Sequence, residues 1–143
     1  MFLDIHLSRE ENLLISILFK NNKLEKIDFK DIKYEKIVKI SSNHLMLPSL
    51  YVNLKRKKLL KHIPNELKEY IKKIYEINKN RNRVLIKELK EVSNYLNSNK
   101  INHVFLKGSS IITGNYIEDI GERMIGDIDI LIDYNQGLLI ELS

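Results

Sequence analysis

Two runs of sequence decide the fold: Val104-Phe105-Leu106-Lys107-Gly108-Ser109-Ser110 and, after a polar connection, Gly126-Asp127-Ile128-Asp129-Ile130-Leu131-Ile132. The first run begins apolar and stops at Lys-Gly-Ser-Ser. In the second run, aspartates and isoleucines alternate with the two-residue period of a strand. We therefore predict two strands joined by the polar connection. Each strand has polar residues at the end that adjoins this connection.

The aspartates of the second run, Asp127 and Asp129, are candidate metal ligands. Side chains two apart in a strand share a face and lie roughly 6–7 Å apart along the chain. Two carboxylates held this way repel each other unless a cation lies near both. Mg²⁺ prefers carboxylate and phosphate oxygens, so this pair favours a magnesium site that takes a nucleoside triphosphate. An edge strand with one solvated face is the alternative explanation.

The Lys-Gly-Ser-Ser sequence is a candidate phosphate-binding bend. Gly108 would let the backbone turn sharply, and Ser109 and Ser110 would cap a following helix through Ile112. The N-terminus of a helix presents free N–H groups to phosphate oxygens, and Lys107 would add a positive charge. An ordinary capped turn would have the same sequence.

The composition indicates a folded protein of one domain, or of one domain with a helical extension. The chain has 143 residues, 43% of them hydrophobic, and no cysteine, which excludes disulfides and thiolate metal sites. The sequence has neither a signal-peptide pattern at its start nor an apolar run long enough for a membrane span, so we expect a cytoplasmic protein without a membrane partner.

The formal charge of +5 is unevenly distributed. Residues 52–100 carry 14 Lys and Arg against 5 Asp and Glu, whereas residues 101–143 carry 2 against 7. This basic helical arm could bind a nucleic acid or another polyanion, and a solvated helix face is the alternative.

The residues before position 100 have helical periodicity. Ser8 and Glu11 form a capping box for a helix over about 9–20, and Asp28 and Asp31 indicate the start of a second helix that ends at residues 41–43. A short helix with Pro48 in its first turn follows, and then one long amphipathic helix over about 64–97. We thus predict a helical region over 1–100 and a strand-containing region over 101–143.

The residues that carry a family resemblance are Leu106-Lys107-Gly108-Ser109-Ser110, Tyr116, Gly121, Arg123 and Asp127-Ile128-Asp129-Ile130-Leu131-Ile132. They resemble the signature of a bacterial nucleotidyltransferase-like family of the DNA polymerase beta-type nucleotidyltransferase superfamily. The helical region is similar to that family at His44 to Leu54 and at Arg81-Asn82. The spacer between Ser109 and Asp127 has 17 residues. It is longer than is usual in the superfamily, and the family resemblance includes it.

The resemblance implies an α+β fold: about four helices, one of them long, packed on a partial nucleotidyltransferase palm of two to three strands. It implies that the protein transfers a nucleoside monophosphate from NTP to a hydroxyl of a protein, an RNA or a small molecule. Asp127 and Asp129 would be catalytic and would ligate Mg²⁺, in a two-ion site if the site is complete. Gly108 and Ser109 would hold the triphosphate.

Two basic residues, Lys107 and Arg123, are further candidates for binding the nucleotide. The planar guanidinium of Arg123 suits a phosphate, an ion pair with Asp127, or a salt bridge to Glu118 or Glu122.

The superfamily normally supplies a third carboxylate from a later strand. Asp133 would lie on the same strand about 13 Å from Asp129, too far to share a metal. Glu141 could approach only if 135–137 forms a hairpin turn that returns 138–142 antiparallel. We therefore expect a palm truncated at the C-terminus, and this leaves two hypotheses open: a nucleotidyltransferase, or an inactive fragment whose helical region binds a partner or RNA.

Overall fold

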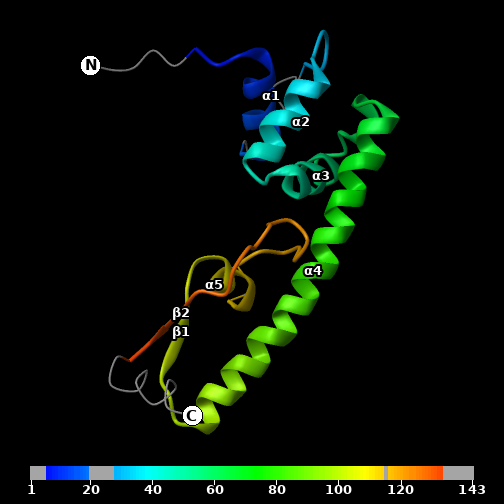
Figure 1. Ribbon diagram of the computed structural model, residues 1–143. Coiled ribbons are helices and arrows are strands. Elements are labelled where there is room, and N and C mark those ends of the chain that lie inside the picture. The colour runs from blue at the N-terminus through cyan, green and yellow to red at the C-terminus, as the bar shows by residue number, and fades with distance from the viewer. Residues whose placement is uncertain (1–5, 20–27, 115, 134–143) are drawn as a thin grey trace, which may run out of the picture. The chain divides into compact units, whose positions relative to one another are not determined.

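The computed structural model describes residues 6–19, 28–114 and 116–133 (Figure 1). Contacts divide the chain into two compact units: the first contains residues 1–78 and 121–123, the second residues 79–120 and 124–143. The helix α4 contributes its N-terminal part to the first unit and the rest to the second. Within the described residues, no helix is long and apolar enough to cross a membrane.

The first unit begins with helix α1 (Arg9–Leu18). The Ser8 hydroxyl accepts a hydrogen bond from the Glu11 N–H, and the Glu11 carboxylate accepts one from the Ser8 N–H at 2.7 Å. The predicted capping box is therefore confirmed. It satisfies backbone donors at a helix end, where no intrahelical acceptor exists.

Helices α2 (Tyr34–Asn43) and α3 (Leu47–Arg56) follow, and a 3₁₀ turn η1 (Leu60–His62) leads to α4 (Asn65–Ser98). The prediction that α2 starts at Asp28 or Asp31 was wrong, because Asp31 has a left-handed φ of 54° and the helix begins three residues later. Pro48 lies in the first turn of α3, as predicted, where a missing N–H breaks no helical bond.

Three of these helices end on a left-handed residue that is not glycine: Leu45 after α2, Lys58 after α3 and Lys100 after α4. In each case the next N–H bonds back five residues, as Leu59 N does to the Leu54 carbonyl at 2.8 Å. This is the Schellman end, in which glycine is usual. All five glycines of the chain lie at or after position 108, so these helix ends carry no glycine signal.

The core of the first unit lies among α1, α2, α3 and the start of α4. Its fully buried side chains include Ile17, Leu50, Leu54 and Ile71. The rings of Tyr51 and Tyr75 pack at a centroid distance of 4.9 Å. These contacts bury the apolar stripes of α1, α2 and α3, each of 10 residues and too short to be a stable helix alone.

The long helix α4 exposes several apolar side chains and buries two asparagines. Tyr70, Ile77, Arg81 and Tyr95 are exposed, whereas Asn78 and Asn82 are 2% and 0% exposed. The buried row runs through Ile71, Tyr75, Asn78, Asn82, Leu85 and Leu89. Amide side chains are tolerated in this buried row because they donate hydrogen bonds to loop carbonyls.

The second unit contains the end of α4, strand β1 (His103–Phe105), helix α5 (Lys107–Thr113) and strand β2 (Ile130–Ile132). The strands pair antiparallel, with Val104 opposite Leu131. Leu85, Leu89, Ile112 and Ile125 form the core between α4 and α5. The α+β class is confirmed, and a third strand at 138–142 falls outside the described residues. The division at residue 100 stays a prediction.

Candidate functional site

The acidic segment lies directly before β2. Residues 124–129 have no regular secondary structure, so the prediction that Asp127 and Asp129 lie inside the strand was wrong. The pairing with β1 nevertheless extends to this segment, because the Leu106 N–H donates to the Asp129 carbonyl at 2.9 Å. The acidic segment and the Lys-Gly-Ser bend therefore lie side by side in the second unit.

Gly108 serves close packing rather than a sharp turn. The left-handed residue is Lys107, with a φ of 48°, and none of the described glycines has a positive φ. A Cβ on Gly108 would lie 2.9 Å from Cγ2 of Ile125, which is 3% exposed. The glycine thus lets α5 lie against the residue two positions before Asp127.

Ser109 connects the bend to the acidic segment through a hydrogen bond. Its side chain is fully buried, and its hydroxyl donates to the Asp127 carbonyl at 3.4 Å. The predicted serine cap is wrong, because the N-cap residue of α5 is Leu106, without a side-chain bond, and both serines lie within the helix. The Ser110 hydroxyl donates to the Lys107 carbonyl at 2.8 Å.

A cation already lies at the acidic pair. The Lys107 Nζ is 2.8 Å from Oδ1 of Asp129, in an ion pair whose side chains are 74% and 32% exposed. The hydrogen bond and charge of Asp129 raise the pKa of Lys107, and the charge of Asp127 raises it further. Asp127 and Asp129 therefore both act on the same ammonium group, although Asp127 is exposed.

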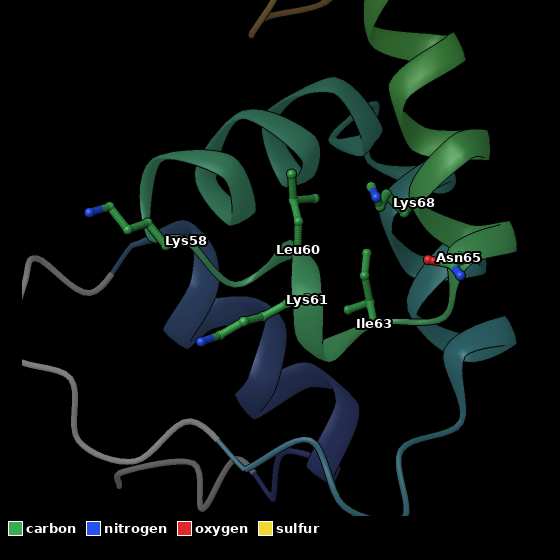
Figure 2. A pocket seen from close by; sticks show the side chains of 6 residues that line it. All are labelled: Lys58, Leu60, Lys61, Ile63, Asn65 and Lys68. Atoms are coloured by element: carbon green, nitrogen blue, oxygen red, sulfur yellow. The ribbon is translucent and has the colours of Figure 1, made fainter.

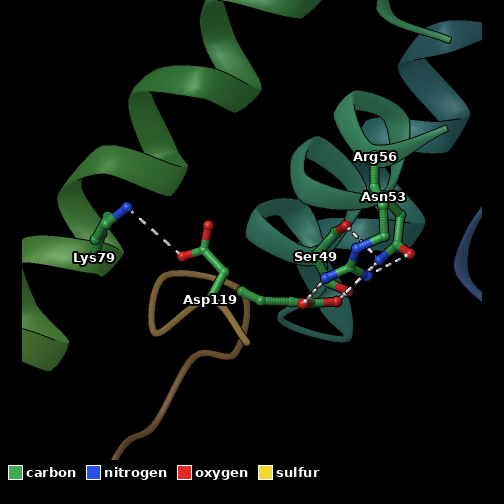
Figure 3. A network of polar contacts seen from close by, with 6 residues as sticks. Ser49, Asn53, Arg56, Lys79 and Asp119 are labelled. Atoms are coloured by element: carbon green, nitrogen blue, oxygen red, sulfur yellow. Dashed lines mark hydrogen bonds and ion pairs between the residues drawn. The ribbon is translucent and has the colours of Figure 1, made fainter. Parts of the chain in front are cut away.

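Polar side chains of α4 hold the connection between α5 and the acidic segment within the second unit. Asn82 donates to the Ile120 carbonyl, and Arg81 donates to the Gly126 carbonyl at 3.2 Å. Figure 3 shows the ion pair of Lys79 with Asp119, 3.8 Å between Nζ and Oδ1. Together these bonds restrain the backbone immediately before Asp127.

The first unit contains three residues of the same connection, Gly121–Arg123. The Asn78 amide donates to the carbonyls of Gly121 and Arg123 at 2.9 and 3.0 Å. The Glu122 carboxylate accepts bonds from Ser49 at 3.4 Å, Asn53 at 3.0 Å and Arg56 at 3.2 Å, all on α3 (Figure 3).

One of the partners predicted for Arg123 is Glu122, and the carboxylate of Glu122 forms an ion pair with Arg56. Arg123 itself is exposed and belongs to the first unit, whereas Lys107, Asp127 and Asp129 belong to the second. A role for Arg123 in nucleotide binding stays a prediction.

The bend and the acidic segment come together as the sequence indicated, and the residues that position them were missed. Ile125 and Asn82 are examples in the second unit, and Asn78 holds the first-unit residues of the connection. Only Asn78 and Asn82 left a signal, since two amides four residues apart interrupt an apolar row. Within the described residues, no group of three or more His, Asp or Glu side chains could hold a metal ion. Glu141 and the 135–137 hairpin lie outside them.

The sequence model of a protein family described as "Uncharacterised nucleotidyltransferase" matches residues 30–141, which include the bend, the connection and the acidic segment. Neither the curated proteins nor the solved structures include a match to this chain.

Proposed function

Because the chain belongs to this nucleotidyltransferase family, we propose that it transfers a nucleoside monophosphate from NTP to an acceptor hydroxyl and releases pyrophosphate, with Mg²⁺ held by Asp127 and Asp129. The observation that supports the proposal is the ion pair of Lys107 with Asp129 at the acidic pair. Two carboxylates that act on one ammonium group are an oxygen donor set that also suits Mg²⁺.

The carboxylates have the central role in this proposal. When bound, Mg²⁺ would neutralise phosphate charge and orient the attacking and leaving oxygens. Asp127 and Asp129 would hold the ion, and their mutual repulsion falls when any cation lies near both. Phosphoryl and nucleotidyl transfer depend mainly on positioning and charge, so two carboxylates beside a basic side chain supply much of what the chemistry requires.

Lys107 would act before and after nucleotide binding. Without nucleotide, its ammonium group lies on Asp129, in the place where the metal would compete. With Mg·NTP bound, the same side chain, which is largely exposed, is free to turn toward a phosphate oxygen. In the absence of nucleotide, Lys107 therefore competes with the metal for Asp129. Once nucleotide is bound, Lys107 would bind a phosphate.

Gly108 and Ser109 would position the triphosphate through the backbone. The Ser109 hydroxyl is buried against the Asp127 carbonyl, so its contribution is to keep the bend and the acidic segment together. The first N–H groups of a helix have no intrahelical acceptor, and Gly108 and Ser109 belong to the first turn of α5. These N–H groups are the donors we propose for phosphate oxygens.

The test is metal and nucleotide binding by the complete chain. Mn²⁺ replaces Mg²⁺ as a spectroscopic probe, and calorimetry follows the four Mg·NTPs. We expect Asp127→Asn and Asp129→Asn each to abolish metal-dependent nucleotide binding. Asp31→Asn, the same change at an exposed aspartate of the first unit, should leave binding unchanged. Wild-type protein that binds no Mg·NTP at millimolar concentration would refute the proposal.

A Lys107→Met variant separates the two roles of this residue. Removing the ammonium should tighten Mn²⁺ binding in the absence of nucleotide and weaken nucleotide binding in its presence. Lys107→Arg, which keeps the charge, should shift Mn²⁺ affinity far less. If Lys107→Met left both affinities at the wild-type values, the proposed competition would be wrong.

A further inference from the structure

An open pocket of about 580 Å³ lies in the first unit, between the end of α3 and the first turns of α4 (Figure 2). Its lining is Lys58, Leu60, Lys61, Ile63, Asn65 and Lys68. Half of these residues are lysines, and the lining contains no carboxylate. The pocket is thus a concentrated positive surface on a unit that contains neither Asp127 nor Asp129.

The ammonium groups of Lys58, Lys61 and Lys68 make no ion pair or hydrogen bond with any part of the chain that the structure describes. Their basic neighbours differ. Lys57 donates to the carbonyls of Ser16 and Ile17 at the end of α1, and Arg56 pairs with Glu122. The basic residues at the end of α3 therefore divide into two groups: Arg56 and Lys57 bind the protein itself, and Lys58 lines the pocket.

The three lysines are spread along the pocket. Figure 2 shows the Lys58 and Lys61 side chains extending to one side of the turn that carries Leu60, whereas Lys68 lies on the side of α4. Charges distributed in this way suit an anion with several groups along its length better than one small phosphate. Asn65 opens α4, so the first-turn N–H groups of this helix add donors at the same place.

We propose that this lysine pocket binds successive phosphates along the backbone of a nucleic acid strand. Ammonium groups recognise phosphodiesters as point charges and carry no sequence information. The lining has no aromatic ring for base stacking, so the binding is independent of sequence and strongly dependent on salt. This site is separate from the proposed nucleotidyl transfer, and its binding requires neither Mg²⁺ nor NTP.

The experiment measures binding of a labelled single-stranded RNA of about 20 nucleotides, longer than a typical single-domain site, by fluorescence anisotropy without Mg²⁺ or NTP. The variant combines Lys58→Gly, Lys61→Gln and Lys68→Gln. Lys58→Gly places glycine at a left-handed helix end, so we expect a melting temperature at or above the wild-type value. Loss of binding would then not reflect unfolding.

The control combines Lys39→Gln, Lys87→Gln and Lys90→Gln. These lysines are exposed and lie outside the pocket, and their ammonium groups make no ion pair or hydrogen bond within the described residues. The net charge changes by the same amount in both variants. We expect the pocket variant to lose affinity about tenfold or more and to reduce the dependence of log K on log salt by roughly 2, since each phosphate contact contributes about 0.7 for single strands. The control should change affinity far less.

Three outcomes would overturn the proposal: no RNA binding by the wild type at low salt, equal losses in the two variants, or an unchanged affinity in the pocket variant. Equal losses would mean that overall charge, and not the pocket, binds RNA. Inorganic tripolyphosphate serves as competitor, and displacement of RNA at equal phosphate concentration would indicate a small polyphosphate ligand instead. A DNA strand of the same sequence should bind within a few-fold of RNA, because the contacts are to phosphates.

Discussion

Replacing Gly108 by alanine tests why glycine stands in the bend. In an ordinary helix the change would stabilise the protein by roughly 0.5–1 kcal/mol, because glycine has more backbone freedom to lose. Here the added methyl would lie 2.9 Å from Cγ2 and 3.3 Å from Cγ1 of Ile125. Ile125 is β-branched and packed in the core, so it has little freedom to turn away.

The expected magnitude follows from these two opposing terms. Overpacking of a core typically costs about 1–3 kcal/mol, which exceeds the gain in propensity. We therefore expect Gly108→Ala to lower the free energy of unfolding by about 1–2 kcal/mol, or the melting temperature by about 3–6 °C for a chain of this size. Urea unfolding followed by circular dichroism measures the difference.

Two controls make this prediction specific. Gly126→Ala is the matched change, since a Cβ there would meet no atom within 4 Å, and its stability should stay within about 0.5 kcal/mol of the wild type. In an Ile125→Ala background the obstacle is gone, so Gly108→Ala should become neutral or stabilising. A Gly108→Ala protein as stable as the wild type, or an equal effect in both backgrounds, would refute the packing argument.

Two further predictions concern the hydrogen bonds that hold the fold. Asn78→Leu keeps the branched shape of the side chain but removes its hydrogen bonds to two loop carbonyls, so we expect about 2 kcal/mol of lost stability in urea unfolding. A loss below about 0.5 kcal/mol would show that water replaces the amide. Hydrogen bonds from Ser8 lower the pKa of Glu11 from 4.5, and this stabilisation is complete above pH 4.5 and is lost as the pH falls through the folded-state value. Ser8→Ala should therefore be least destabilising in acid, and a constant difference across pH would contradict the role of the Glu11 charge.

Local patterns were sufficient for much of the helical region. The capping box at Ser8, the first-turn position of Pro48 and the long apolar row of α4 each depend on residues within one turn or one helix face. Such features require no knowledge of distant contacts. The helix ends were harder to place, because Leu45, Lys58 and Lys100 adopt the left-handed conformation without the glycine that usually indicates it.

The sequence also predicted that the Lys-Gly-Ser bend and the acidic pair lie close together. The prediction came from the alternation of aspartates with isoleucines and from the family resemblance. The sequence alone established helices before residue 100, a short sheet after it, and which polar residues are candidates for nucleotide and metal. Only the tertiary structure decided how they are held: Gly108 against Ile125, Lys107 on Asp129, and Arg81 on the Gly126 carbonyl. These contacts join residues 17 to 45 positions apart, and no local period encodes them, since the position of each partner depends on the folded chain.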